Sequence, residues 1–139
     1  MVYTYNQTTG EFKSAIGEIT KGYSGFGEGK NNPAMEGIAD VGPIPVGSYE
    51  CLTPINSKNL GPDSIALIAS EDTNTFGRSA FYIHGDSVNH PGLASHGCII
   101  IPPGTRKAIK KGDIINVISG ITPISVNIND SIELKESVQ

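Results

Sequence analysis

A cysteine and a histidine stand at the ends of two apolar runs in the middle of this sequence. Cys98 closes a Ser-His-Gly-Cys block and precedes three isoleucines, and His84 ends the run Phe-Tyr-Ile. A thiol beside an imidazole makes a cysteine nucleophile, because the ring takes the proton that the thiol must lose. The pattern therefore predicts nucleophilic cysteine chemistry at the ends of two strands.

The residues next to Cys98 suit attack on a carbonyl group. Gly97 lets the backbone turn tightly and lets a substrate approach, and we expect the N–H groups of Gly97 and Cys98 to face a developing oxyanion. Ser95 is expected to hold this turn by hydrogen bonds. Strand alternation puts His84 on the same face as Tyr82, so His84 meets Cys98 if the two strands are neighbours.

Three histidines compete for the role of general base. His84 ranks first because a rigid strand would hold its ring. His96 ranks second, since its position two residues from Cys98 is constrained by local geometry. His90 ranks third, because it lies in a loop before a proline and is expected to be solvated.

Two alternatives use the same residues. The stretch holds zinc-ligand types but lacks the spacing of common sites, so we expect neither a metal nor a cofactor; the ligand types are His84, Asp86, His90, His96 and Cys98. Cys51 and Cys98, the only two cysteines, would form at most one structural disulfide. A disulfide-stapled domain therefore stays open as an alternative.

Three charged residues near the block each have two interpretations. Arg106 is either a solvated charge on a helix or the partner of a substrate carboxylate, because its fork binds a carboxylate bidentately. The same pair of roles applies to Arg78, for which the structural one is favoured. Asp86 is expected to close an Asx-turn after Gly85, with contact to a substrate ammonium as the alternative.

Composition limits the class of protein. The 139 residues suit one domain, and the 17 glycines and 9 prolines favour short strands and turns. A net charge of −4 without a basic stripe argues against nucleic acid. No apolar run is long enough for a membrane span. The N-terminus has neither a positive region nor an apolar region of a secretory leader.

The expected elements are mostly short strands. A hairpin is predicted over residues 2–5 and 11–16, then a loop over 22–33, and a rigid bend at 41–47 that leads into a strand. Further strands are predicted at 65–69, 80–83, 98–101, 113–118 and 124–128. One helix is predicted over 105–111 with Thr105 as its N-cap, after a stop at Pro102-Pro103-Gly104. A polar tail covers 130–139. The fold class is therefore mainly β, a sandwich or a barrel-like pair of sheets.

These motifs resemble the YkuD-like L,D-transpeptidases, in which a histidine precedes a Ser/Thr-His-Gly-Cys block. The wider pattern is closest to short L,D-transpeptidase-related toxins delivered by type VI secretion; it comprises Gly22-Tyr-Ser-Gly, Gly42-Pro-Ile-Pro-x-Gly47-x-Tyr49, Gly77-Arg-Ser-Ala-Phe-Tyr-Ile-His-Gly-Asp86 and Arg106. The resemblance implies an L,D-transpeptidase-like β-sandwich of short mixed strands with one short helix after the cysteine. It places a catalytic domain at 1–120, with a strand and polar tail of the same domain at 121–139.

The resemblance also implies an activity on peptidoglycan. Cys98 would attack the bond between meso-diaminopimelate and D-alanine in a stem tetrapeptide, and His84, oriented by the Gly85 carbonyl, would take the thiol proton. Water would then give L,D-carboxypeptidase activity, and an amine would give exchange or cross-linking. The expected substrate-binding residues are Tyr82, Asp86, Ser95, His96 and Arg106.

The resemblance further implies a setting. We expect synthesis in the cytoplasm without a signal peptide and action in the periplasm of target bacteria. The expected partners are stem peptides, a cognate immunity protein and a component of the secretion apparatus. A non-catalytic wall-binding module of the same fold is the alternative function.

Overall fold

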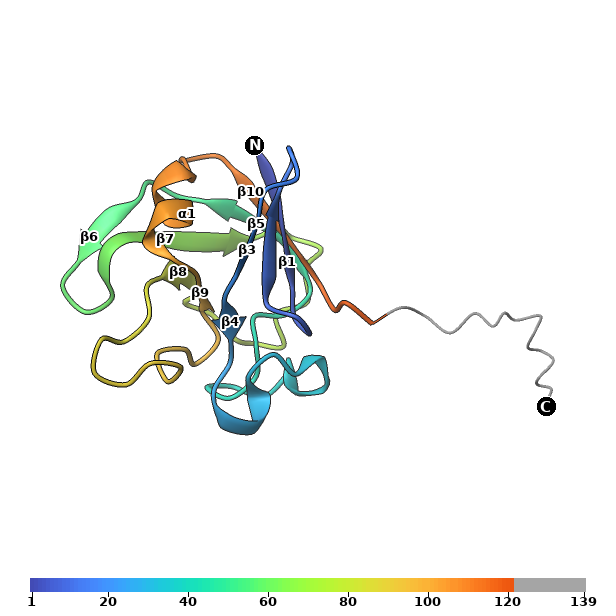
Figure 1. Ribbon diagram of the computed structural model, residues 1–139. Coiled ribbons are helices and arrows are strands. Elements are labelled where there is room, and N and C mark those ends of the chain that lie inside the picture. Colours follow the sequence, from blue (N-terminus) through green and yellow to red (C-terminus); the bar gives the residue numbers. More distant parts are fainter. Residues whose placement is uncertain (122–139) are drawn as a thin grey trace, which may run out of the picture.

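Ten short strands form one mixed sheet in the computed structural model, which describes residues 1–121 (Figure 1). The strands are β1 (Val2–Asn6), β2 (Glu11–Ser14), β3 (Ile19–Lys21), β4 (Tyr23–Ser24), β5 (Gly47–Cys51), β6 (Ile55–Ser57), β7 (Gly61–Ala69), β8 (Tyr82–His84), β9 (Ile99–Ile100) and β10 (Ile114–Ile118). One α-helix, α1 (Pro103–Ala108), and two single 3₁₀ turns, η1 (Gly27–Gly29) and η2 (Pro33–Met35), complete the described elements. The expectation of a mainly β fold with one short helix after Cys98 is confirmed.

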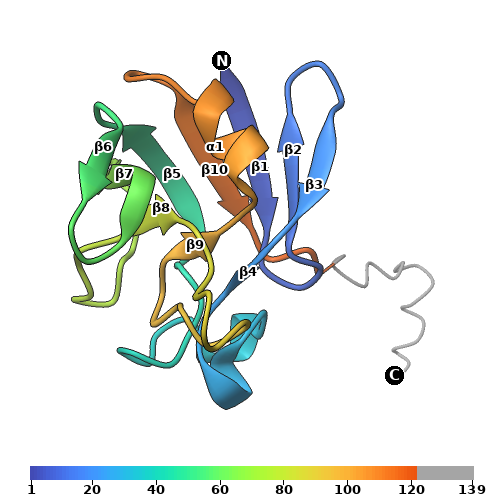
Figure 2. The same cartoon turned by 60° about the vertical axis from the view of Figure 1, so that its left-hand side comes forward.

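The order of the strands makes the sheet curl back on itself. The order is β3-β2-β1-β10-β5-β7-β8-β9-β4, with β6 paired to β7. The two ends of this order, β3 and β4, are separated in the chain only by Gly22. Figure 2 shows β4 beside β9, its antiparallel partner, and β3 beside β2. A Cβ atom at Gly22 would lie 1.8 Å from the Ile100 carbonyl oxygen, so this closure requires glycine.

The core lies inside the curl and comes from alternate residues of the strands. In β1 the buried residues are Tyr3 and Tyr5, and in β10 they are Ile115 and Val117. β1 and β10 pair in parallel although they are the first and the last described strands, whereas β1 and β2 form the predicted antiparallel hairpin. The N-terminal ammonium group adds a contact of 2.9 Å to the Asp113 carboxylate, next to the start of β10.

Two loop regions lie at one end of the sheet. The segment between β4 and β5 and the segment between β8 and β9 are side by side in both views (Figures 1 and 2). Ile44, Pro43 and Pro45 of the predicted rigid bend are fully buried. Gln7 donates to the Ile44 carbonyl oxygen at 2.8 Å, which anchors the bend to the strand layer.

Some predicted elements differ from the structure. The helix covers Pro103–Ala108 and its N-cap is Pro102, so the predicted span and the Thr105 cap are wrong. A proline at the first helical position has a preset φ and lacks only an N–H that would be unpaired there, so it begins the helix. β3, β4 and β6 were not predicted, because they are short and lack clear alternation. The predicted strand at 124–128 lies outside the described residues.

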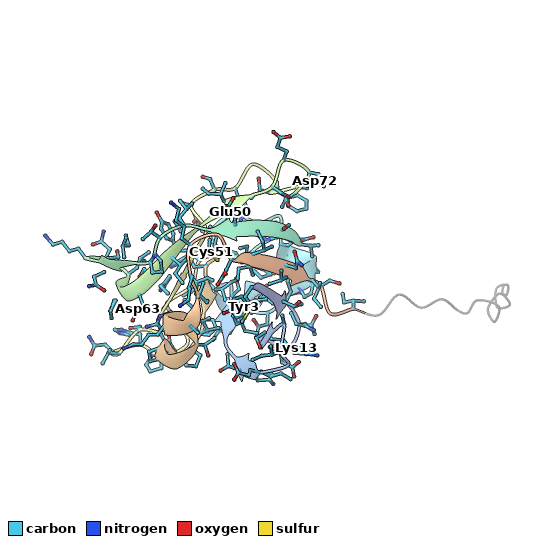
Figure 3. The ribbon with its side chains drawn as sticks, turned by 90° about the horizontal axis from the view of Figure 1, so that it is seen from above. Tyr3, Lys13, Glu50, Cys51, Asp63 and Asp72 are labelled. Carbon is cyan, nitrogen blue, oxygen red and sulfur yellow. The ribbon has the colours of Figure 1, made fainter. Side chains whose placement is uncertain are left out.

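The two cysteines are not bonded to each other. Both are free, so a Cys51–Cys98 disulfide is wrong for this structure. Cys51 is fully buried on β5. Figure 3 labels it together with Tyr3 of β1, and β1 and β5 are the two strands that flank β10. Burial raises the pKa of the Cys51 thiol to about 12. Cys51 is therefore a core residue. Within residues 1–121, no helix is long and apolar enough to cross a membrane.

Candidate active site

The strand that ends in His84 and the strand that directly follows Cys98 are neighbours. β8 and β9 pair in parallel, with Ile83 opposite Ile99 and His84 opposite Ile100. Continued by one residue, this register brings Cys98 to the level of Tyr82. The predicted thiol–imidazole pair required neighbouring strands, and the structure has them. His84 lies two residues further along its strand than the level of Cys98.

Ser95 holds the turn that presents Cys98. Its side chain is fully buried, and its hydroxyl donates to the Cys98 carbonyl oxygen at 2.6 Å. Oγ of Ser95 also accepts from the Gly97 N–H at 3.1 Å and from the Gly25 N–H at 2.9 Å. The hydroxyl thus closes the turn and ties it to the segment after β4. Its burial gives Ser95 a structural role in place of the expected contact with substrate.

Gly97 is required for the shape of this turn. Its φ of 131° lies in the region that favours glycine, and a Cβ atom there would lie 2.4 Å from Nη2 of Arg78. The contact of its N–H with Ser95 occupies the donor that was expected to face an oxyanion. Of the two N–H groups expected from the sequence to face an oxyanion, only that of Cys98 remains available for this contact.

The Cys98 thiol is half-buried and protonated at rest. Its Sγ lies 4.0 Å from the Ala80 carbonyl oxygen. Burial raises the pKa of the thiol, while the backbone N–H of Tyr82 and the positive charge of Arg78 act to lower it. The neutral thiol therefore needs a base before it can attack.

The His84 imidazole has the properties of such a base. The side chain is 4% exposed, and its Nδ1 lies 2.9 Å from the Gly85 carbonyl oxygen. Because a carbonyl only accepts, Nδ1 carries the hydrogen and Nε2 the lone pair. Nε2 is buried and has no hydrogen-bond partner among residues 1–121. Burial lowers the pKa of His84, the charge of Arg106 lowers it further, and the Gly85 contact and Asp86 raise it.

The two groups open onto separate hollows. His84 borders one of about 420 Å³ with Asn59, Asp86 and His90. Cys98 borders another of about 340 Å³ with Asp40, Arg78 and His96. A larger hollow of about 590 Å³ lies elsewhere, between Tyr3, Phe12 and Thr105, and contains neither group.

Asp86 organises the loop that follows β8. Its carboxylate accepts from the N–H groups of Ser87 at 2.8 Å and Gly92 at 3.1 Å, and from the Tyr23 hydroxyl at 2.6 Å. The Tyr23 hydroxyl in turn accepts from the Ala94 N–H at 2.9 Å. Asp86 therefore caps this loop as predicted, but through the N–H groups of Ser87 and Gly92 and not through an Asx-turn, which would bond the residue two positions on. Burial raises the pKa of Asp86, and these hydrogen bonds more than offset it, so the pKa lies below its ordinary value.

Arg106 is buried behind the base. It is 4% exposed, so the interpretation as a solvated helix charge is wrong. Its Nη1 donates to the Ile101 carbonyl oxygen. A Cβ atom added to Gly85 would lie 3.0 Å from either terminal nitrogen of Arg106. The guanidinium therefore packs against the peptide whose carbonyl orients His84, which leaves it little surface for a substrate carboxylate.

The other two histidines are exposed. The His96 ring stacks on Phe26 with centroids 4.9 Å apart, and its Nδ1 lies 3.1 Å from the Asp40 carbonyl oxygen. It borders the hollow of Cys98, and His90 borders that of His84. Among residues 1–121, no group of three or more His, Cys, Asp or Glu residues is arranged to hold a metal ion.

Arg78 has the structural role that its sequence context favours, whereas no sequence pattern predicts the contacts of Tyr23. Arg78 borders the hollow of Cys98 and binds backbone on two sides of it. Tyr23 bridges Asp86 and Ala94. The only sequence signal for either was its place in a motif of the resemblance, Gly77-Arg and Gly22-Tyr.

A comparison with models of known protein families gives a match. A family model described as the Tlde1 domain matches residues 18–116, which include β8, β9 and the Ser95–Cys98 turn. None of the curated proteins compared with the chain matches it. The match covers well over half of the 139 residues.

Proposed function

Because this chain belongs to the Tlde1 domain family, type VI secretion effectors related to L,D-transpeptidases, we propose that it is a cysteine enzyme that cleaves or exchanges peptidoglycan stem peptides. The observation that carries the proposal is the placement of a buried, neutral imidazole at the end of β8 and a half-buried thiol directly before the neighbouring strand β9. The proposed substrate is the bond between meso-diaminopimelate and D-alanine of a tetrapeptide.

In the first step, Sγ of Cys98 attacks the carbonyl carbon of meso-diaminopimelate. Nε2 of His84 takes the thiol proton, and the Gly85 carbonyl stabilises the charged ring through Nδ1. Both groups are neutral at rest, so proton transfer accompanies the attack. We assign the oxyanion contact to the Cys98 N–H.

In the second step, the tetrahedral intermediate collapses to a thioester on Cys98. The C–N bond breaks, and His84 returns its proton to the leaving D-alanine nitrogen. Water activated by His84 then releases a tripeptide, which is L,D-carboxypeptidase activity. An amine acceptor in place of water gives exchange or cross-linking, and no metal or cofactor enters either route.

The proposed substrate contacts follow the two hollows. His96, which borders the hollow of Cys98, and Tyr82, which is level with Cys98 in the strand register, are assigned to the substrate near the thiol. Asp86 is assigned to the side of His84, where it shapes the loop at which the leaving amine and the acceptor would lie. Ser95 is assigned to holding the turn that presents Cys98, and Arg106 to supporting the Gly85 peptide behind His84. Neither is assigned a contact with substrate.

The proposed setting is attack on other bacteria. Delivery by a type VI secretion apparatus would bring the enzyme to the periplasm of a target cell, where its substrate lies. A cell that makes such an enzyme needs a cognate immunity protein, which we expect to cover the hollows beside Cys98 and His84.

The test is incubation with purified tetrapeptide muropeptides and mass spectrometry of the products. We expect release of D-alanine, or its replacement when a D-amino acid is added, and loss of both in Cys98→Ala. Cys51→Ala is the matched control, since it removes the buried thiol instead. If the reduced protein neither releases nor exchanges D-alanine, the proposal is wrong.

The same variant separates an enzyme from a wall-binding module. A module that only binds would keep its wall binding and its toxicity in Cys98→Ala. For the enzyme, Cys98→Ala abolishes toxicity in the periplasm while binding to isolated sacculi persists.

A further inference from the structure

Arg78 makes an unusual set of contacts for a side chain in an exposed loop. Its Nη1 donates to the carbonyl oxygens of Glu36 and of Pro43, the latter at 2.8 Å. Its Nη2 donates to the carbonyl oxygens of Gly42 at 3.0 Å and of His96 at 3.4 Å. One guanidinium thereby connects the segment before β5 with the turn that presents Cys98.

These bonds determine what Arg78 is free to do. A guanidinium has five N–H groups, and the four on its terminal nitrogens are used by the four carbonyls. Only Nε remains, so Arg78 has no free fork for a substrate carboxylate. Its Cζ also lies 5.4 Å from the centroid of the Phe81 ring, which belongs to the core. The guanidinium is therefore fixed from both sides.

The backbone around Arg78 is held in uncommon conformations. Asp40, Phe76 and Ala80 have φ values of 62°, 56° and 63°, although none is glycine. Residues persist in this region when the surrounding structure over-determines them. Phe76 and Ala80 bracket Arg78 in the chain, and Asp40 lies in the segment that it binds. All but Phe76 border the hollow of Cys98.

Gly97 completes the relationship with the nucleophile. The space that a side chain at Gly97 would need is occupied by Nη2 of Arg78. The charge of Arg78 also acts on the Cys98 thiol in the direction that favours the thiolate. The backbone of the turn and the charge beside the sulfur thus depend on the same side chain.

We propose that Arg78 is the positioning residue of the nucleophile: its fork joins the 36–43 segment to the His96–Cys98 turn and holds a positive charge at the hollow that Cys98 borders. This inference rests on the proposed thiol chemistry, but its test does not need the peptidoglycan reaction. A side chain with only a structural role would affect stability and leave the reactivity of Cys98 in the folded protein unchanged.

The first measurement is the rate of Cys98 alkylation by iodoacetamide as a function of pH, with peptide mapping to separate Cys98 from buried Cys51. In Arg78→Gln the midpoint should move to higher pH, and the rate below the midpoint should fall roughly tenfold for each pH unit of the move. Lys58→Gln removes the same charge from an exposed site and should change neither quantity. If Arg78→Gln is folded and its pH midpoint of alkylation equals that of Lys58→Gln, the proposal is wrong.

Arg78→Lys separates the charge from the fork. An ammonium group keeps the charge but cannot span both segments with parallel bonds. We expect an alkylation midpoint close to that of the wild type, together with faster hydrogen exchange at the amides of residues 96–98. If Arg78→Gln fails to fold, Arg78→Lys decides, because unchanged exchange at these amides would overturn the proposal. If the wild-type protein shows no activity on muropeptides, that result contradicts the proposed function and leaves the role of Arg78 unaffected.

Discussion

Nδ1 of His84 lies 2.9 Å from the carbonyl oxygen of Gly85, and this contact sets the tautomer of a buried ring. The hydrogen is fixed on Nδ1, so Nε2 holds the lone pair. Nε2 is buried without a partner among residues 1–121. In the proposed mechanism this free acceptor takes the proton from Cys98, and several measurable consequences depend on it.

The first prediction concerns pH. The pKa of His84 is lowered, chiefly by burial, so the ring stays neutral to lower pH than an ordinary imidazole. In the pH profile of kcat/KM on a tetrapeptide, the midpoint of the acid limb should therefore lie below pH about 6.5, the ordinary pKa of histidine. The pKa of the Cys98 thiol is raised, so the alkaline limb should lie above the ordinary range of a thiol. An acid limb above 6.5 would contradict His84 as the base.

The second prediction concerns the charge behind the base. Arg106 lowers the pKa of His84, so Arg106→Met should raise it and move the acid limb of kcat/KM to higher pH. Titration of the His84 ring by NMR measures the change directly. Lys107→Met is the matched control, because Lys107 is the exposed neighbour of Arg106 on α1. If the pKa of the His84 ring is the same in both variants, Arg106 does not have this electrostatic role.

The third prediction concerns the serine of the turn. Ser95→Ala leaves the buried N–H groups of Gly25 and Gly97 without their acceptor. Each such group costs about 1–3 kcal/mol, so the free energy of unfolding should fall by at least that much in urea titrations. Activity at a temperature where the variant is folded should fall as well. Ser79→Ala, which changes an exposed serine bordering the hollow of Cys98, should change stability little.

The fourth prediction concerns closure of the sheet. Gly22→Ala would place a methyl group on the Ile100 carbonyl, and should destabilise the protein by several kcal/mol, about the range of severe core substitutions. Gly104→Ala is the control, since nothing lies within 4 Å of its Cβ position in α1. That change should be neutral or stabilise the helix by up to about 1 kcal/mol. Thermal unfolding of the two variants would decide, and similar midpoints would contradict the role given to Gly22.

The sequence predicted the strands of the site because their apolar runs end in recognisable turn residues. Residues 80–83 and 98–101 read as strands, and β8 and β9 lie within or beside them. The start of α1 differs from the prediction, since the pattern predicts a stop at Pro103 and the structure has Pro103 as the first helical residue. Local patterns carry such information, with errors at the ends of elements.

Contacts between distant loops could not be predicted in the same way. Arg78 binds carbonyl oxygens of residues 36, 42, 43 and 96, and a carbonyl has no residue-specific signal in the sequence. The burial of Arg106 was equally hidden, because a helix of six residues shows too little periodicity to reveal its inner face. Both arginines acquire their surroundings only from the tertiary fold.

The parallel pairing of β1 with β10 has a consequence for how this protein acquires its shape. The first strand has no partner on that side until residues 114–118 have been synthesised, and β4 cannot meet β9 before residues 99–100 are present. Folding of such a high-contact-order chain cannot proceed piece by piece from the N-terminus. A nascent or translocating chain truncated before β10 should therefore lack a formed thiol site, and refolding should be slow and all-or-none.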